Sequence, residues 1–309
     1  MSGHAPGAPG EEPTWASSDK DFVIAALGRS RLWATVGHGV LNEIYWPTTG
    51  RPRTRDVTFY LHHEDGTGAW IDLKRVASYE LSTPDPTVPL LTVRHSGAQA
   101  GERYALNLEF LPDSDRDALL VSWAVEGPWR MVVVAAPHID AEGRRSLAWV
   151  EDGTLFASDE DGLPALCIAA NGGFETPGAG YVGTSDGWQD LAANGRLTLD
   201  WDEAGPGNVA LSGECTGSAG QFAIAMAGDA RGARTLARAT LSDATDAVRR
   251  AFVAEWKGWA KTLRLPAIGS GPADREAALH EAALRSAVVL KAHEDHSFPG
   301  AAVASLSTP

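Results

Sequence analysis

The sequence has few cysteines, a deficit of positive charge and no long apolar run. Its two cysteines leave no zinc-finger spacing to consider. Acidic residues number 40 against 26 basic ones, and the net charge of -14 argues against nucleic acid and anionic membrane surfaces as partners. No apolar run approaches the length of a membrane span. The composition therefore favours a globular protein that binds neither nucleic acid nor anionic membranes.

The two cysteines are Cys167 and Cys215. Cys167 lies within an apolar run, residues 165–170, that is typical of a buried strand. We expect two buried free thiols, because free cysteine is among the most buried residue types. The alternative is one disulfide, which requires that the two strands be neighbours.

The N-terminus lacks the basic region and apolar core of a signal peptide, so we expect a cytoplasmic protein. Residues 1–14 are rich in proline and glycine, which predicts an extended arm rather than a helix.

Residues 15–241 consist of short apolar or alternating runs separated by Gly, Asp, Asn and Pro. Residues 103–110 and 118–125 are examples, and Asp65-Gly66 is one of the hairpin-type turns between such runs. This spacing is typical of an all-β sandwich. We therefore predict a mainly β fold, with more than a dozen antiparallel strands in two large sheets.

The apolar period changes after residue 241. Residues 242–263 carry apolar side chains at spacings of three or four, residues 266–272 form a Pro/Gly breaker, and residues 273–293 form a second helical stretch. A helix of this kind needs a partner for its apolar face. We expect the second helix to be the first element of a helical domain whose remainder is missing.

Tryptophan is abundant, with 11 residues, and flat indole rings suit the apolar faces of sugars. Most of these side chains are expected in the core, since tryptophan is highly buried on average. Trp46 and Trp188 lie in loop-like surroundings and are the better candidates for surface contacts with sugar.

Histidines and carboxylates give no clear catalytic motif. Residues 293–296 (His-Glu-Asp-His) lack the spacing of a zinc protease site, so we predict a helix-end network that fixes the following loop, and no metal site. His38, His95 and His138 could serve an epimerase if they met a glutamate on one sheet face. Among 40 acidic residues we nominate no catalytic pair.

Several segments resemble bacterial glucoamylases and glucodextranases of glycoside hydrolase family 15. The segments that carry the resemblance, in chain order, are residues 5–10, 13–16, 19–21, 43–47, 54–56, 180–191, 255–256, 290–295, 299–301 and 304–307. The resemblance spans essentially the whole chain, and residues 290–295 (Leu-Lys-Ala-His-Glu-Asp) with 299–301 and 304–307 are its most specific part.

The resemblance implies a galactose-mutarotase-like β-supersandwich at 15–241, a linker helix and loop at 242–271, and the start of an (α/α)6 barrel at 272–309. In that family the barrel carries two catalytic glutamates, and the complete enzyme hydrolyses α-1,4 or α-1,6 bonds from non-reducing ends with inversion. This chain ends before both glutamates, so we expect it to be inactive alone, with no catalytic residue of its own.

The resemblance further implies that Ser305 and Ser307, near the barrel mouth, touch sugar. No cofactor is implied, and calcium is compatible but not derivable. Two alternatives stay open: a non-catalytic α-glucan-binding module with an exposed line of aromatics, and a sugar-converting enzyme of the aldose-epimerase type.

Overall fold

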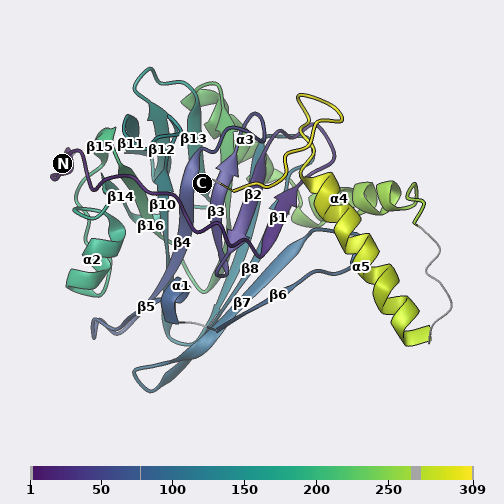
Figure 1. The fold of residues 1–309 in the computed structure, drawn as a ribbon. Coiled ribbons are helices and arrows are strands. Elements are labelled where there is room, and N and C mark those ends of the chain that lie inside the picture. Colours follow the sequence, from purple (N-terminus) through teal and green to yellow (C-terminus); the bar gives the residue numbers. More distant parts are fainter. Residues whose placement is uncertain (1–2, 77, 266–272, 308–309) are drawn as a thin grey trace.

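The computed structural model describes residues 3–76, 78–265 and 273–307. Two antiparallel β-sheets pack face to face, and helices lie at one side and at the C-terminal end (Figure 1). The described residues hold seventeen strands and five helices. The predicted mainly β sandwich is confirmed.

The eight-stranded sheet is built from strands in the first half of the chain together with two from residues 175–214. Its order is β1 (Phe22–Ala25), β2 (Trp33–Gly37), β3 (Val40–Tyr45), β4 (Thr54–His63), β10 (Trp129–Pro137), β16 (Val209–Glu214) and β14 (Glu175–Tyr181), and β5 (Trp70–Asp72) pairs with β4 beside this path.

The nine-stranded sheet takes strands from the middle of the chain. Its order is β15 (Glu203–Gly207), β11 (Ser146–Glu151), β12 (Thr154–Asp159), β13 (Ala165–Ala170), β17 (Ala219–Ala227), β9 (Ala118–Glu126), β8 (Glu102–Pro112), β7 (Leu91–Gln99) and β6 (Ser78–Ser82).

The main core fills the space between the two sheets. Leu106 and Leu108 of β8 alternate with polar neighbours and face inward, opposite Phe59 and Leu61 of β4, and all four are fully buried. Such alternation follows from the two-residue period of a strand, which sends successive side chains to opposite faces.

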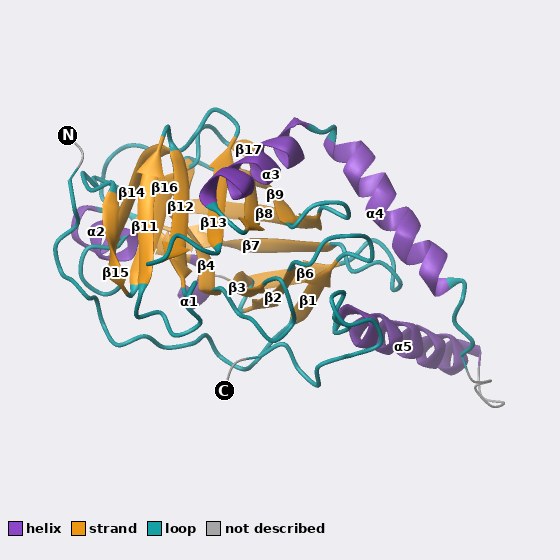
Figure 2. Ribbon diagram, turned by 90° about the horizontal axis from the view of Figure 1, so that it is seen from above, coloured by secondary structure: helices purple, strands orange, loops and turns teal. Residues whose placement is uncertain are grey.

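The outer face of the nine-stranded sheet is also buried, because the helix α3 (Ala230–Ser242) covers it (Figure 2). The strands β13 and β17 present only small side chains there, including Cys167 and Ala225, and α3 meets them with Ala233 and Ala237. Small residues on both sides let the helix approach the sheet closely. Because both faces of these strands are buried, their sequences are continuous apolar runs rather than alternating ones.

The helix α3 was not predicted, because residues 15–241 were assigned to strands and turns. Asp229 caps its first turn by accepting a hydrogen bond from the Gly232 N–H at 2.7 Å. The predicted helical stretch at 242–263 therefore starts too early: Ser242 ends α3, and Ala244 precedes the next helix with no side-chain cap.

Two further helices follow, α4 (Thr245–Ala260) and α5 (Ala273–Ala292). Phe252 and Trp256 bury one face of α4 completely in the same cluster as α3. No described helix is long and apolar enough to cross a membrane.

The described part of the N-terminal arm, residues 3–14, contains no helix, makes a turn at residues 6–9 and lies against the sandwich (Figure 1). The Gly3 N–H donates to Asp202 Oδ1 at 2.8 Å, and the Glu11 N–H donates to the Val182 carbonyl at 3.0 Å. Two short helices, α1 (Leu73–Val76) and α2 (Gly187–Asn194), flank the outer face of the eight-stranded sheet.

Both cysteines are free and buried, which confirms the predicted pair of thiols. Cys167 lies under α3, whereas Cys215 belongs to the core between the sheets. Burial raises the pKa of Cys167 to about 12, so this thiol stays protonated and chemically inert at neutral pH.

Candidate functional site

The loop that follows α5, residues 293–307, is anchored to the sandwich through one carboxylate; we call it the C-terminal loop. Asp295 Oδ2 accepts from the Thr49 N–H at 2.8 Å and from the Thr49 hydroxyl at 3.0 Å. Its Oδ1 accepts from the N–H groups of Ser297 at 2.7 Å and Phe298 at 3.2 Å. Burial raises the pKa of Asp295, but these hydrogen bonds outweigh it and hold the pKa below its usual value.

Two further contacts fix the C-terminal loop. His296 Nδ1 lies 2.6 Å from the Ser30 carbonyl, which can only accept, so this nitrogen carries the proton. The His296 ring packs at 5.1 Å from that of Trp33, and the Ser297 hydroxyl donates to the Pro47 carbonyl at 3.1 Å. The predicted helix-end network is therefore confirmed as a structural clamp.

A groove of ≈490 Å³ opens between β1, the end of α5 and the C-terminal loop; we call it the α5 groove. Its apolar walls include Phe22, Val288 and Ala292, and the buried Leu306 closes its floor. This volume lies within the range of small-molecule sites.

Ser305 lines this groove together with Leu306, and Ser307 follows Leu306 in the chain. Leu306 is 1% exposed and anchors the chain, whereas Ser305 is exposed and Ser307 is half-buried. Their hydroxyl oxygens lie 2.9 Å apart, so one hydroxyl donates a hydrogen bond to the other. The two serines predicted to touch sugar are thus brought together at the surface.

The α5 groove offers no acid–base pair. Among its described lining residues Asp21 is the one carboxylate, and its Oδ2 accepts from the His38 N–H at 2.9 Å and the Tyr79 hydroxyl at 3.0 Å. Glycoside hydrolysis requires two carboxyl groups flanking the scissile bond. The described lining of the groove therefore lacks the pair of carboxyl groups that hydrolysis requires.

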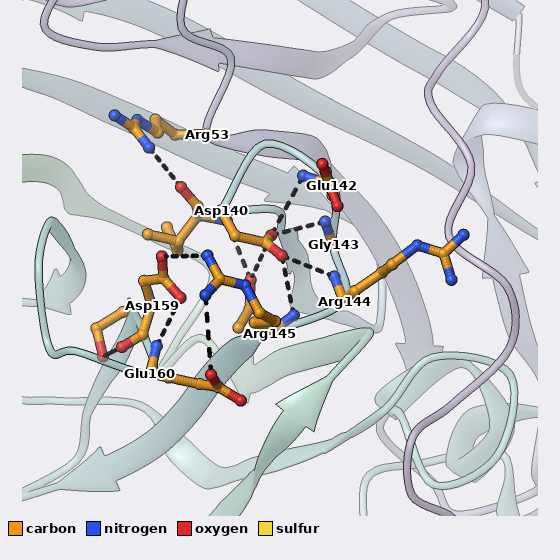
Figure 3. A network of polar contacts seen from close by, with 11 residues as sticks. Arg53, Asp140, Glu142, Gly143, Arg144, Arg145, Asp159 and Glu160 are labelled. Atoms are coloured by element: carbon orange, nitrogen blue, oxygen red, sulfur yellow. Dashed lines mark hydrogen bonds and ion pairs between the residues drawn. The ribbon is translucent and has the colours of Figure 1, made fainter.

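A denser group of carboxylates, around Asp140, closes a loop instead (Figure 3). Asp140 accepts hydrogen bonds from the N–H groups of Gly143 at 2.7 Å, Arg144 at 3.0 Å and Arg145 at 2.9 Å. Burial raises the pKa of Asp140, but the backbone donors outweigh it and lower the pKa overall. Asp159 pairs with Arg145 at 3.2 Å. Asp140 is thus held in its ionised form by backbone donors, which is unsuitable for a proton donor.

Trp46 was predicted at the surface, and this prediction is wrong. Its side chain is 8% exposed, and its Nε1–H donates to Asp117 Oδ2 at 2.7 Å. The Arg31 guanidinium lies 5.6 Å from the ring centroid and itself pairs with Asp117 at 2.9 Å. Because the ring is buried, with Arg31 over one face and its N–H bound to Asp117, Trp46 offers no exposed platform to a sugar.

Trp188 was expected in a loop, but it lies in the first turn of α2. Asp186 caps that helix by accepting from the Gln189 N–H at 2.9 Å. Trp188 is half-buried, and its Nε1–H donates to Asp72 Oδ2 at 3.2 Å. It packs in a different apolar cluster from Trp46, so the exposed line of aromatics expected for a binding module does not form from these two residues.

The three histidines considered for an epimerase do not converge on a glutamate. His95 and His138 are fully buried, and their Nε2 atoms face Gly39 O at 2.8 Å and Asn208 Oδ1 at 3.4 Å. Burial lowers the pKa of both imidazoles. His38 sits in the left-handed region at the turn between β2 and β3.

A histidine–glutamate pair that the sequence did not reveal does exist on the eight-stranded sheet. His62 Nε2 lies 3.0 Å from Glu214 Oε2, and Arg130 reaches the other oxygen at 3.3 Å. Burial raises the pKa of Glu214, but His62 and Arg130 outweigh it and lower the pKa. The two residues meet only because β4, β10 and β16 pair in a particular register. No local sequence pattern specifies that register, so the sequence alone did not predict the pair.

Described residues contain no group of three or more His, Cys, Asp or Glu side chains arranged to hold a metal ion.

Comparisons with known proteins agree with this architecture. A family model described as glucodextranase, domain N, matches residues 5–261. A curated glucoamylase from Clostridium sp. (strain G0005) is 27% identical over 320 residues, which cover 97% of this chain and 43% of the relative. A crystal structure of a bacterial glucoamylase complexed with acarbose superimposes with a TM-score of 0.88 at 23% identity, covering 99% of this chain and 45% of that chain. The chain spans less than half the length of these two glucoamylases.

Proposed function

Because the chain belongs to the family of glucodextranase N domains, we propose that it is the N-terminal part of a glucosidase acting on α-glucans. The complete enzyme hydrolyses α-1,4 or α-1,6 glucosidic bonds from non-reducing ends with inversion. The family match and the likeness to two glucoamylases over almost the whole chain support this proposal.

The observation that carries the proposal is the surface of α5, which projects from the sandwich (Figures 1 and 2). Val288 and Ala292 pack against the body, so the helix is not wholly without a partner. Yet Leu279 is 45% exposed and Leu290 71% exposed, on a second face of the same helix. Packing supplies most helical stability, so this second apolar face fits a further helical layer, as in an (α/α)6 barrel.

The same proposal makes the 309-residue chain inactive by itself. An inverting glycosidase needs one carboxylic acid to protonate the leaving oxygen and one carboxylate to activate water. The α5 groove holds Asp21 alone among its described lining, and the acids around Asp140 are held by structural partners. The proposed hydrolysis uses two carboxyl groups from the helical domain and requires no cofactor.

The position of Ser305 and Ser307 supports a role for both serines in sugar binding. Their hydroxyls lie together at the mouth of the α5 groove, on a loop fixed by Asp295. A sugar hydroxyl can replace the bond between the two serines without leaving either group unsatisfied. We propose that they bind the substrate once the helical domain is in place.

A chimera tests this function. The chain is joined at its C-terminus to the catalytic part of the Clostridium glucoamylase, and the matched control carries the substitution Leu290→Asp. We expect release of β-glucose from maltotetraose and a lower melting temperature of the helical domain in the control, because a charge then faces the domain interface. Equal melting temperatures in the two folded chimeras would contradict the docking role.

A further inference from the structure

A second hollow, of ≈290 Å³, lies on the outer face of the eight-stranded sheet; we call it the outer-face pocket. Strands β4 and β10 form its floor, while α1 and the start of α2 form its walls. It is lined by parts of residues 54–56 and 180–191, two segments that the sequence analysis singled out and that the proposed hydrolysis does not use.

A β-bulge brings the cationic side chain of Arg55 to this pocket. Ala136 faces Asp56 and Pro137 faces Thr54, so Arg55 is the extra residue between them. The bulge lets Arg55 and Asp56 line the pocket together, although neighbours on a regular strand point to opposite faces. The Nε atom of Arg55 is buried without a hydrogen-bond partner among the described residues. Such an unmet donor costs free energy unless a ligand or water satisfies it.

An unmet acceptor lies in the same pocket. Asp72 Oδ2 accepts from the Trp188 Nε1–H at 3.2 Å and lies 3.3 Å from Arg75 Nε, which fixes the carboxylate. Its other oxygen, Oδ1, is buried and has no partner within the described part of the chain. The side chain is 11% exposed, and Asp72 is among the residues that line the pocket.

The other charged residues that line the pocket limit which kinds of ligand it can bind. Lys74 Nζ lies 3.1 Å from Asp56 Oδ2, so these two charges compensate each other. Four carboxylates line the pocket, which disfavours an anionic ligand: Glu11, Asp56, Asp72 and Asp186. Their arrangement forms no metal-binding group. A hydroxyl, in contrast, can accept from Arg55 and donate to Asp72 at the same time.

We propose that the outer-face pocket is a second binding site, for one neutral pyranose sugar, and that Arg55 and Asp72 bind its hydroxyl groups. The volume lies at the lower end of the range for ligand sites and suits a single ring. The inference goes beyond the proposed function and rests on it only for the choice of glucose-based probes.

The test is sugar binding to the 309-residue chain, measured by saturation-transfer NMR with glucose, maltose, isomaltose and galactose. We expect binding of at least one of them and a loss of about tenfold in affinity for Arg55→Met, because a hydrogen bond to a charged group is removed. The variant Trp188→Phe, which keeps the ring but frees Asp72, is expected to weaken binding by a smaller factor. The control Arg94→Met removes a guanidinium that pairs with Glu126 on the other sheet and should bind as the parent does.

Melting curves establish that each variant is folded. Binding of none of the four sugars, or equal binding by Arg55→Met and Arg94→Met, would overturn the proposal. Preference for galactose over glucose would support the pocket while counting against α-glucan as the substrate. Failure of glucose release by the chimera leaves these binding results unaffected, so the two proposals fail separately.

Discussion

The two outer faces of the sandwich differ in what covers them. On the nine-stranded sheet, small apolar side chains meet α3, and Phe252 and Trp256 of α4 complete a dry cluster. On the eight-stranded sheet, charged and hydroxyl side chains surround an open pocket with an unmet donor and an unmet acceptor. The outer face of the nine-stranded sheet thus contributes to stability through apolar packing. The outer face of the eight-stranded sheet holds polar groups whose lack of described partners costs free energy, and a bound ligand can offset that cost.

The largest effect is expected on the sealed face. The substitution Trp256→Ala removes a fully buried side chain and should lower the free energy of unfolding by about 3–5 kcal/mol. The control Leu290→Ala changes a side chain that is 71% exposed and should stay within about 0.5 kcal/mol. Urea denaturation of both variants measures the contrast. Equal losses would show that α5 is packed as firmly as α4.

A smaller, pH-dependent effect is expected at the clamp of the C-terminal loop. Removing the charge by Asp295→Asn should cost about 1.5–3 kcal/mol at neutral pH, since its hydrogen bonds are charge-assisted. The folded pKa of Asp295 lies below the unfolded one, so this stability is present above the unfolded pKa and is lost as pH falls through the folded pKa. Parent and variant should therefore converge in melting temperature on acidification from about pH 7 to about pH 2. If the difference in melting temperature did not depend on pH, the loss would come from altered packing rather than from the lost charge, which would contradict this prediction.

The smallest effect on stability is expected in the outer-face pocket. Because Arg55 Nε has no partner among the described residues, Arg55→Met removes no stabilising bond and should lower the free energy of unfolding by no more than about 0.5 kcal/mol. Denaturation of this variant beside Arg31→Met, whose guanidinium pairs with Asp117, sharpens the comparison. A large loss in Arg55→Met alone would mean that the polar face is also a stability element.

The sequence predicted the sandwich because its signals are local. Apolar and polar residues alternate along 103–110, and turns such as Asp65-Gly66 separate runs of this kind. Both patterns predict strands wherever one face of the strand is buried. The sequence did not predict α3, because this helix is rich in Ala, Arg and Thr and has only a narrow apolar stripe. Ala233 and Ala237 form that stripe and pack against the small side chains of the sheet. The resemblance of residues 290–307 to the family, together with the local Ser305–Ser307 pair, located the C-terminal loop.

Other features of the sites depend on distant partners. Trp46 is buried because Asp117, 71 residues away, accepts its N–H. His62 meets Glu214 through the pairing of three strands, and Arg55 enters its pocket through a bulge opposite Ala136 and Pro137. Pairing register and bulge position are set by the whole sheet, and no local residue pattern specifies them.

The central claim is that this chain supports a glucosidase without performing the chemistry. The most direct test is glucose release from maltotetraose, soluble starch and dextran by the purified 309-residue chain, with the product anomer followed by NMR. The account predicts no release above the buffer control, because no pair of carboxyl groups is placed to act as acid and base in the described α5 groove. Release of glucose, in either anomer, would show that carboxylates within this chain perform hydrolysis and would contradict it.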